Sequence, residues 1–129
     1  MSRSTILTVL VGIVLAGCEK QPDPEEIIAQ GKATFDAHCV ACHGPDGDVR
    51  AADQYDPATP DLRTIASRSP QGRMPRVMLT EIIDGRRVVQ AHGNRTMPVW
   101  GEALGMDDGG SADEKIDALV KYVESIQNP

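Results

Sequence analysis

The stretch Cys39-Val40-Ala41-Cys42-His43 decides how this chain folds. Two cysteines enclose two residues and a histidine follows directly, which is the spacing of a covalent c-type haem attachment site. The two thiols can form thioethers with the two vinyl groups of one haem, and the adjacent imidazole can bind the iron. The motif therefore predicts one haem c attached through Cys39 and Cys42, with His43 as an iron ligand.

Other uses of a CxxC pair need to be compared with this one. Such a pair also occurs as a redox dithiol, as half of a zinc site or as a structural disulfide. A zinc site needs two more ligands at similar spacing, and the chain has only one further cysteine, Cys18. A thioredoxin-like dithiol belongs at the head of a helix that follows a strand, and no strand-rich pattern precedes Cys39. The adjacent His43 favours haem attachment.

The first residues have the pattern of an export signal. Arg3 supplies a positive charge, and residues 6–16 are mostly apolar but too few to span a bilayer as a helix. Leu15-Ala16-Gly17-Cys18 resembles a bacterial lipobox, which implies cleavage before Cys18 and lipid on its sulfur. An ordinary signal peptide with a chance cysteine is the alternative. We predict a signal peptide over residues 1–17, a lipidated N-terminus and short tether over 18–24, and a haem-binding domain over 25–129.

Lipidation of Cys18 would explain why the chain has an odd number of cysteines, and it would also indicate where the protein is located. A lipoprotein carries several acyl chains, which suffice for stable anchoring to a membrane surface. The predicted location is the periplasmic side of the bacterial cell envelope. The formal net charge of −6 argues against a nucleic-acid partner, because a basic patch is the required footprint. The acidity could steer a basic docking partner or simply keep the protein soluble.

The rest of the chain reads as helices joined by long loops, with no convincing strand pattern. Asp23 and Pro24 can begin a helix that carries Gly31 and Phe35 on one face. A second helix is expected over residues 77–84 and ends at Gly85. A third begins at a capping box formed by Ser111 and Glu114 and runs to near Pro129. A shorter helix is expected over residues 60–67. Residues 44–57, 69–73 and 106–110 are expected to be loops. We predict a small all-α domain of about four helices whose loops wrap around the haem.

A second axial ligand must come from elsewhere in the chain. Met97 precedes Pro98, which favours an extended backbone that can carry a side chain across the open haem face. His92 is the rival, because it lies in the same loop. The remaining candidates are less favourable by position: Met74, Met78, Met106 and His38. Met78 is expected on the buried stripe of its helix, and His38 is too close to Cys39 to reach around the ring.

Taken together, these motifs resemble those of class I bacterial cytochromes c with a single haem. The resemblance covers roughly residues 25–128. Its carriers are the CxxCH motif with Gly44, the pairs Gly31/Phe35 and His92/Gly93, and the segments Pro60-Asp61-Leu62, Gly85, Met97-Pro98-Val99-Trp100-Gly101 and Leu119-Val120-Lys121-Tyr122-Val123. The CxxCH and MPxWG elements are specific in combination. The polar loop over residues 46–55 matches nothing in the pattern.

The resemblance implies roles for several residues. It makes His43 the proximal ligand and Met97 the distal one, with a backbone carbonyl near Pro60 orienting His43. Leu62 would pack on the ring, and Trp100 belongs to the same cofactor-binding set. Outside the haem site, Gly31 and Phe35 would meet Tyr122 where the first and last helices cross.

These expectations define a function. Methionine and histidine coordination favours reduced iron and leaves no open position, which suits transfer of single electrons rather than catalysis. We therefore expect an electron carrier, not an enzyme, with redox proteins such as a respiratory complex, a dehydrogenase or an oxidase as partners. A haem subunit of such an oxidoreductase is an alternative. A haem sensor or peroxidase-like enzyme is another, if Met97 dissociates easily.

Overall fold

The computed structural model describes residues 21–87, 97–106 and 110–129. All regular elements in these ranges are helical, which confirms the all-α prediction. The α-helices are α1 (Pro24–His38), α2 (Val40–His43), α3 (Ile65–Arg68), α4 (Arg76–Asp84), α5 (Trp100–Gly105) and α6 (Ala112–Ser125). Single 3-10 turns cover Pro45–Gly47, Val49–Ala51 and Leu62–Thr64.

The ends of the main helices follow local sequence signals. The Asp23 carboxylate accepts a hydrogen bond from the Glu25 N–H at 3.0 Å, which caps the start of α1. Ser111 and Glu114 form a complete capping box at the start of α6. Gly85 closes α4 in a left-handed conformation with φ 95°. These three boundaries confirm the sequence predictions, whereas α5 was not among the predicted helices.

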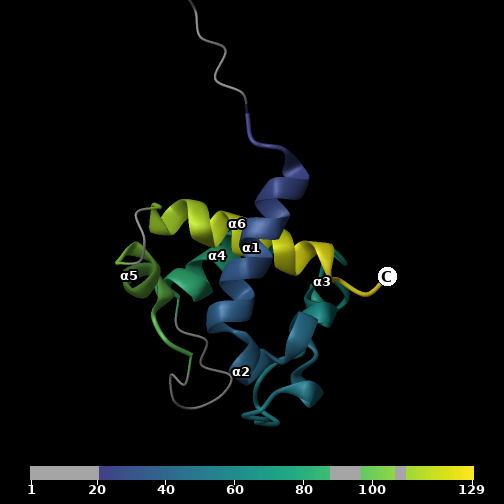
Figure 1. The fold of residues 1–129 in the computed structure, drawn as a ribbon. Helices are drawn as coiled ribbons and strands as arrows, with labels where there is room; N and C mark the ends of the chain where they lie inside the picture. The colour runs from purple at the N-terminus through teal and green to yellow at the C-terminus, as the bar shows by residue number, and fades with distance from the viewer. Residues whose placement is uncertain (1–20, 88–96, 107–109) are drawn as a thin grey trace, which may run out of the picture.

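The two longest helices, α1 and α6, cross closely (Figure 1). A Cβ atom added at Gly31 would lie 2.0 Å from the Ala118 carbonyl oxygen, so only glycine allows this approach. Beside the crossing, the rings of Phe35 and Tyr122 pack in a tilted arrangement with centroids 5.2 Å apart. The predicted contact between the first and last helices is therefore confirmed.

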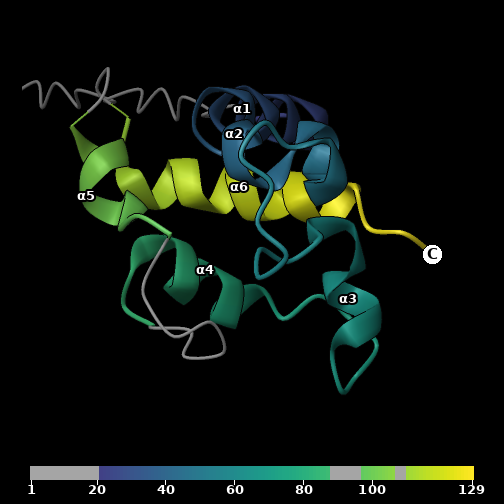
Figure 2. The ribbon, with the colours of Figure 1, turned by 90° about the horizontal axis from the view of Figure 1, so that it is seen from below.

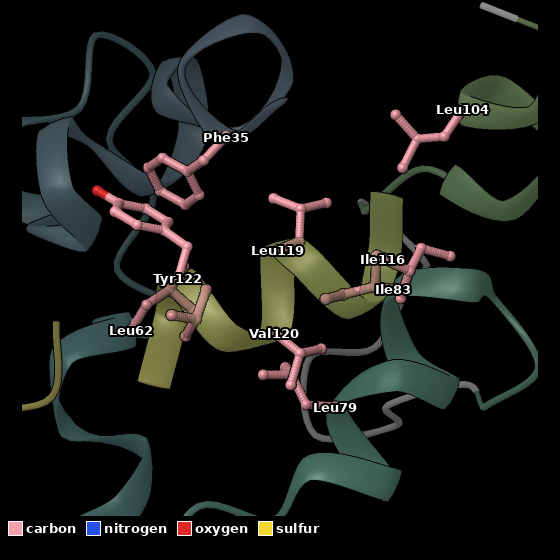
Figure 3. Close-up of a cluster of buried hydrophobic side chains, with 10 residues drawn as sticks. Phe35, Leu62, Leu79, Ile83, Leu104, Ile116, Leu119, Val120 and Tyr122 are labelled. Carbon is pink, nitrogen blue, oxygen red and sulfur yellow. The ribbon is translucent and has the colours of Figure 1, made fainter. Parts of the chain in front are cut away.

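The hydrophobic core extends along α6. Phe35 and Tyr122 lie at one end, and Leu104, Ile116 and Ile83 lie at the other (Figure 3). Phe35, Leu104 and Ile116 are each only 1% exposed. Such side chains contribute about 1.5–3 kcal/mol each through burial.

Helix α6 separates two sides of the molecule. Helices α1 and α2 lie on one side of it, and α3 and α4 lie on the other (Figure 2). Leu79 and Ile83 of α4 are buried in the core. Met78 is 41% exposed, so its predicted place on the buried stripe of α4 is wrong. The reason is geometric: residues 79 and 83 lie four apart on one helical face, and residue 78 is turned about 100° away from residue 79.

Candidate haem site

The CxxCH motif occupies a single helical turn at the end of α1. Cys39 ends α1, its N–H donating to the Phe35 carbonyl at 2.8 Å, and α2 follows at once. The His43 N–H donates to the Cys39 carbonyl at 2.9 Å, which closes the turn. Cys39 and Cys42 lie three residues apart and therefore occupy the same side of the turn. Two thiols on one side of a turn can bond to two positions on one flat group.

The two thiols differ in environment. Cys39 is partly buried and packs against the core, whereas Cys42 is exposed. Burial, followed by the neighbouring Cys42, raises the pKa of the Cys39 thiol to about 12. Neither thiol forms a disulfide in the described part of the chain. Both sulfur atoms are therefore available for thioether bonds.

The imidazole of His43 has one nitrogen in the protein interior. Its Nδ1 atom is buried and lacks a hydrogen bond of normal geometry. Burial lowers the pKa of His43, and the nearby Pro60 carbonyl acts in the opposite direction. The Pro60 carbonyl therefore lies near the imidazole, while Nδ1 itself has no hydrogen-bond partner. A proton on Nδ1 would leave the Nε2 lone pair for a metal, which is the usual arrangement of a ligating histidine.

The segment that carries Pro60 is held by its neighbours. Arg63 forms ion pairs with Asp61 at 2.7 Å and with Asp48 at 3.0 Å. The Leu62 carbonyl accepts a hydrogen bond from the Gln127 amide at 2.7 Å, and the Leu62 side chain is buried in the core. These contacts hold the segment that carries Pro60, whose carbonyl lies near His43.

A second network holds the loop that follows His43. The Tyr122 hydroxyl donates to the Asp46 carboxylate at 2.8 Å, and Lys32 lies 3.4 Å from the same carboxylate. Asp46 has φ 49°, a left-handed conformation that asparagine and aspartate tolerate better than most residues. Sequence reasoning found no role for the polar loop over residues 46–55. Its polar residues bind groups distant in sequence, which no local pattern could reveal.

The segment from Met97 to Trp100 is fixed against the end of α4. A Cβ atom at Gly85 would lie 2.6 Å from Val99 Cγ1, and one at Gly101 would lie 2.2 Å from Asp84 Oδ1. Met97 and Trp100 both pack against the core, as Cys39 does. The Trp100 ring also contacts His38, next to Cys39, with centroids 5.3 Å apart. The structure therefore brings the MPxWG and CxxCH elements to the same core.

The other ligand candidates are placed differently. Met74 packs against the core, so it remains a candidate. Met106 is 81% exposed, which separates it from the core that Met97 contacts. His92 and Cys18 lie outside the described residues.

These features fit a haem attached by two thioethers. Two free thiols share one side of a turn, and the adjacent histidine has a buried, unsatisfied Nδ1. A family model described as Cytochrome c matches residues 28–127. The chain belongs to the cytochrome c family. No curated protein and no solved structure matches it.

Family membership determines the cofactor and the class of activity. The cofactor of this cytochrome c is a covalent haem c, bound through the CxxCH motif. Cytochromes c of this family act as electron carriers rather than as enzymes. In the described ranges, no helix has the length and apolar character needed to cross a membrane.

Proposed function

We propose that this cytochrome c carries single electrons between redox proteins at the periplasmic membrane surface, with His43 and Met97 as iron ligands and a lipid on Cys18 as its anchor. The observation that carries the proposal is the turn from Cys39 to His43, with Nδ1 of His43 buried and without a partner and the Pro60 carbonyl near the imidazole. Haem c supplies a one-electron couple at this turn.

His43 is suited to be the proximal ligand because its ring is held by the protein. A carbonyl at Nδ1 selects the tautomer whose Nε2 can bind iron and limits rotation of the ring. Pro60 is held in place by the contacts of Asp61, Leu62 and Arg63 described above. Leu62 and Trp100 contribute apolar surface next to the attachment turn, which keeps water away and favours the reduced state.

Met97 is the best supported distal ligand. It precedes Pro98, packs against the same core as Cys39, and lies on a segment fixed by Gly85 and Gly101. Bound to the haem iron, the Met97 thioether would raise the reduction potential and would exclude O₂ or peroxide. Met74 contacts the same core as Met97, and His92 lies in the same loop of the sequence as Met97. Both are therefore tested as alternative distal ligands.

The distal ligand is tested by substitution in the matured holoprotein. Met97→Ala should abolish the ferric charge-transfer band near roughly 695 nm, lower the potential and allow CO to bind. His92→Ala and the volume-conserving Met74→Leu should leave all three properties unchanged. Loss of the band only in Met74→Leu would make Met74 the ligand. A parent protein without the band, altered by His92→Ala, would indicate bis-histidine coordination with a lower potential.

The same experiment separates the carrier from the alternative functions. A sensor or peroxidase-like enzyme requires an accessible iron position, so the unmodified ferrous protein would bind CO rapidly. A haem subunit of a dehydrogenase or oxidase would keep the Met97 band but copurify with a larger complex. For the carrier, we expect no CO binding in the parent and reversible one-electron titration.

The anchor has its own test. Cys18→Ser should move the holoprotein from the membrane to the soluble fraction without changing its absorption spectrum. Mass spectrometry of the parent should show Cys18 as the first residue, bearing lipid, and a haem mass that survives denaturation. An unmodified Cys18 would refute the anchor, and haem released on denaturation would refute covalent attachment through Cys39 and Cys42.

A further inference from the structure

A glutamine just beyond the end of α6 has both ends of its amide in hydrogen bonds. Gln127 Oε1 accepts from the Ala66 N–H at 2.8 Å, and Nε2 donates to the carbonyls of Leu62 and Val123, each at 2.7 Å. Fixing a long, flexible side chain in one conformation costs entropy, which these bonds must offset. Gln127 therefore joins the end of α6 to residues 60–66, which we call the Pro60 segment.

The groups that Gln127 holds are backbone groups of the Pro60 segment. Ala66 lies in the first turn of α3, whose N–H groups have no partner within the helix. The Thr64 side chain does not cap this turn, because its hydroxyl donates to a carbonyl instead. The Gln127 amide takes the place of that cap. Next to it, the Asn128 N–H donates to the Arg63 carbonyl at 2.8 Å, so the chain after α6 runs along the segment.

The loop after His43 meets the same place. A Cβ atom added at Gly47 would lie 3.0 Å from Ile126 Cδ1 and 3.1 Å from Leu62 Cβ. Gly47 therefore lies between the end of α6 and the Pro60 segment. Leu62 also lies beside Tyr122, in the second half of α6 (Figure 3). The end of α6, the Pro60 segment and the loop after His43 thus pack together.

The Pro60 carbonyl depends on these neighbours for its position. Proline has no backbone N–H, so Pro60 cannot be fixed by donating a hydrogen bond of its own. Its carbonyl lies near the His43 imidazole, whose buried Nδ1 has no other partner in the described part of the chain. Gln127 holds the chain two residues farther on, at the Leu62 carbonyl. A shift of Leu62 would therefore move the carbonyl that faces the ring.

We propose that Gln127 is a positioning residue for His43: by holding Leu62, it keeps the Pro60 carbonyl beside the imidazole and keeps water away from Nδ1. The proposal rests on the proposed role of His43 as an iron ligand. A carbonyl at Nδ1 orients the ring of a ligating histidine. Gln127 does not touch the ring and acts on it only through the backbone of the Pro60 segment.

The test is hydrogen exchange of the His43 Nδ1 proton in the ferrous holoprotein, followed by NMR in D₂O. This proton exchanges only when the residues that cover it open. Gln127→Met keeps the length of the side chain and removes its hydrogen bonds to Leu62 and Ala66. We expect exchange to become about tenfold faster, because the Pro60 segment opens more often.

Two control variants separate positioning from a general loss of stability. Asn128→Ala removes the neighbouring amide, which forms no side-chain hydrogen bond with the described residues, and keeps the backbone bond to Arg63. Ser111→Ala removes the capping box at the opposite end of α6 and destabilises the protein without touching the Pro60 segment. Exchange of the His43 proton should change less than about twofold in both controls.

A second substitution tests which hydrogen bond matters. Gln127→Glu keeps an oxygen that can accept from the Ala66 N–H but replaces the donor to the Leu62 carbonyl with an oxygen. We expect the same acceleration as in Gln127→Met, because Leu62 is the contact nearer to Pro60. Slow, parent-like exchange in Gln127→Glu alone would mean that Gln127 only caps α3, and the proposal would be wrong.

Two other results would also overturn it. One is parent-like exchange in Gln127→Met, and the other is equal acceleration in Ser111→Ala, since exchange would then follow global unfolding. The proposed function fails on a different observation. Ring protons of His43 that lack the large paramagnetic shifts of an iron ligand in the ferric parent would refute ligation by His43 itself, whereas unchanged exchange in the Gln127 variants would leave that ligation intact.

Discussion

Gly31→Ala is the most direct test of how α1 and α6 are held together. Intrinsic helix propensity alone predicts that the substitution stabilises the protein by about 1 kcal/mol, because alanine is the better helix former. The structure predicts the opposite sign. The new Cβ would lie 2.0 Å from the Ala118 carbonyl oxygen and 2.5 Å from its carbonyl carbon. Both are backbone atoms of α6, so the conflict can be relieved only by moving one helix.

The size of the effect follows from that displacement. Carbon atoms do not approach a carbonyl oxygen closer than about 3 Å, so the helices must separate by about 1 Å. A gap of this size forfeits a quarter to a half of the dispersion energy of each affected contact. Overpacking of this kind costs about 3 kcal/mol, and the gain in propensity reduces the net loss to about 2 kcal/mol. For a domain of this size, the melting temperature should fall by about 10 °C.

The assay is thermal and denaturant unfolding of the holoprotein, followed by far-ultraviolet circular dichroism and by haem absorbance. Gly105→Ala provides a matched control in α5, since its Cβ would meet only the Ala112 Cβ at an ordinary 3.7 Å. We expect that variant to match the parent within about 1 kcal/mol. A Gly31→Ala protein as stable as the parent would refute the close crossing.

Three further predictions concern side chains near the crossing and the attachment turn. Phe35→Ala should cost about 3–5 kcal/mol, because Phe35 is 1% exposed in the core, and unchanged unfolding would place it outside. Burial and then Asp46 raise the pKa of Tyr122 to about 12, so the parent should lose stability as pH rises from about 10 through 12, and Tyr122→Phe should lack that part of the loss. The hydrogen bond from Arg63 lowers the pKa of Asp61, so its stabilisation is present above about pH 4 and lost in acid. Unfolding of Asp61→Asn should therefore be less sensitive to acid than unfolding of the parent, and equal sensitivity would contradict the ion pair.

Much of this cytochrome c could be inferred from short-range patterns. The CxxCH spacing predicted the cofactor because two thioether bonds and an adjacent ligand need residues within one helical turn. The starts of α1 and α6 and the end of α4 were predictable for a similar reason: Asp23, Ser111 and Gly85 satisfy or close backbone groups within their own turn. Family resemblance then implied the contact of Phe35 with Tyr122, which the structure confirms.

The polar contacts of the loop after His43 were not predictable. Asp46 binds Tyr122, seventy-six residues away, and Asp48 pairs with Arg63. The sequence contains many carboxylates, and nothing local distinguishes these two from residues that only face solvent. The burial of Met78 was mispredicted because α4 is short and has five apolar residues, so more than one of its faces could have been the buried one.

The sequence by itself determined the attachment chemistry, the helical class and the main helix boundaries, because each depends on residues within a few positions of one another. Only the tertiary structure decided which faces the helices bury, which loop carboxylates are bound, and which distant carboxylates pair with Arg63 and Arg76. Those properties depend on where distant segments meet, and net charge or composition averages over that arrangement.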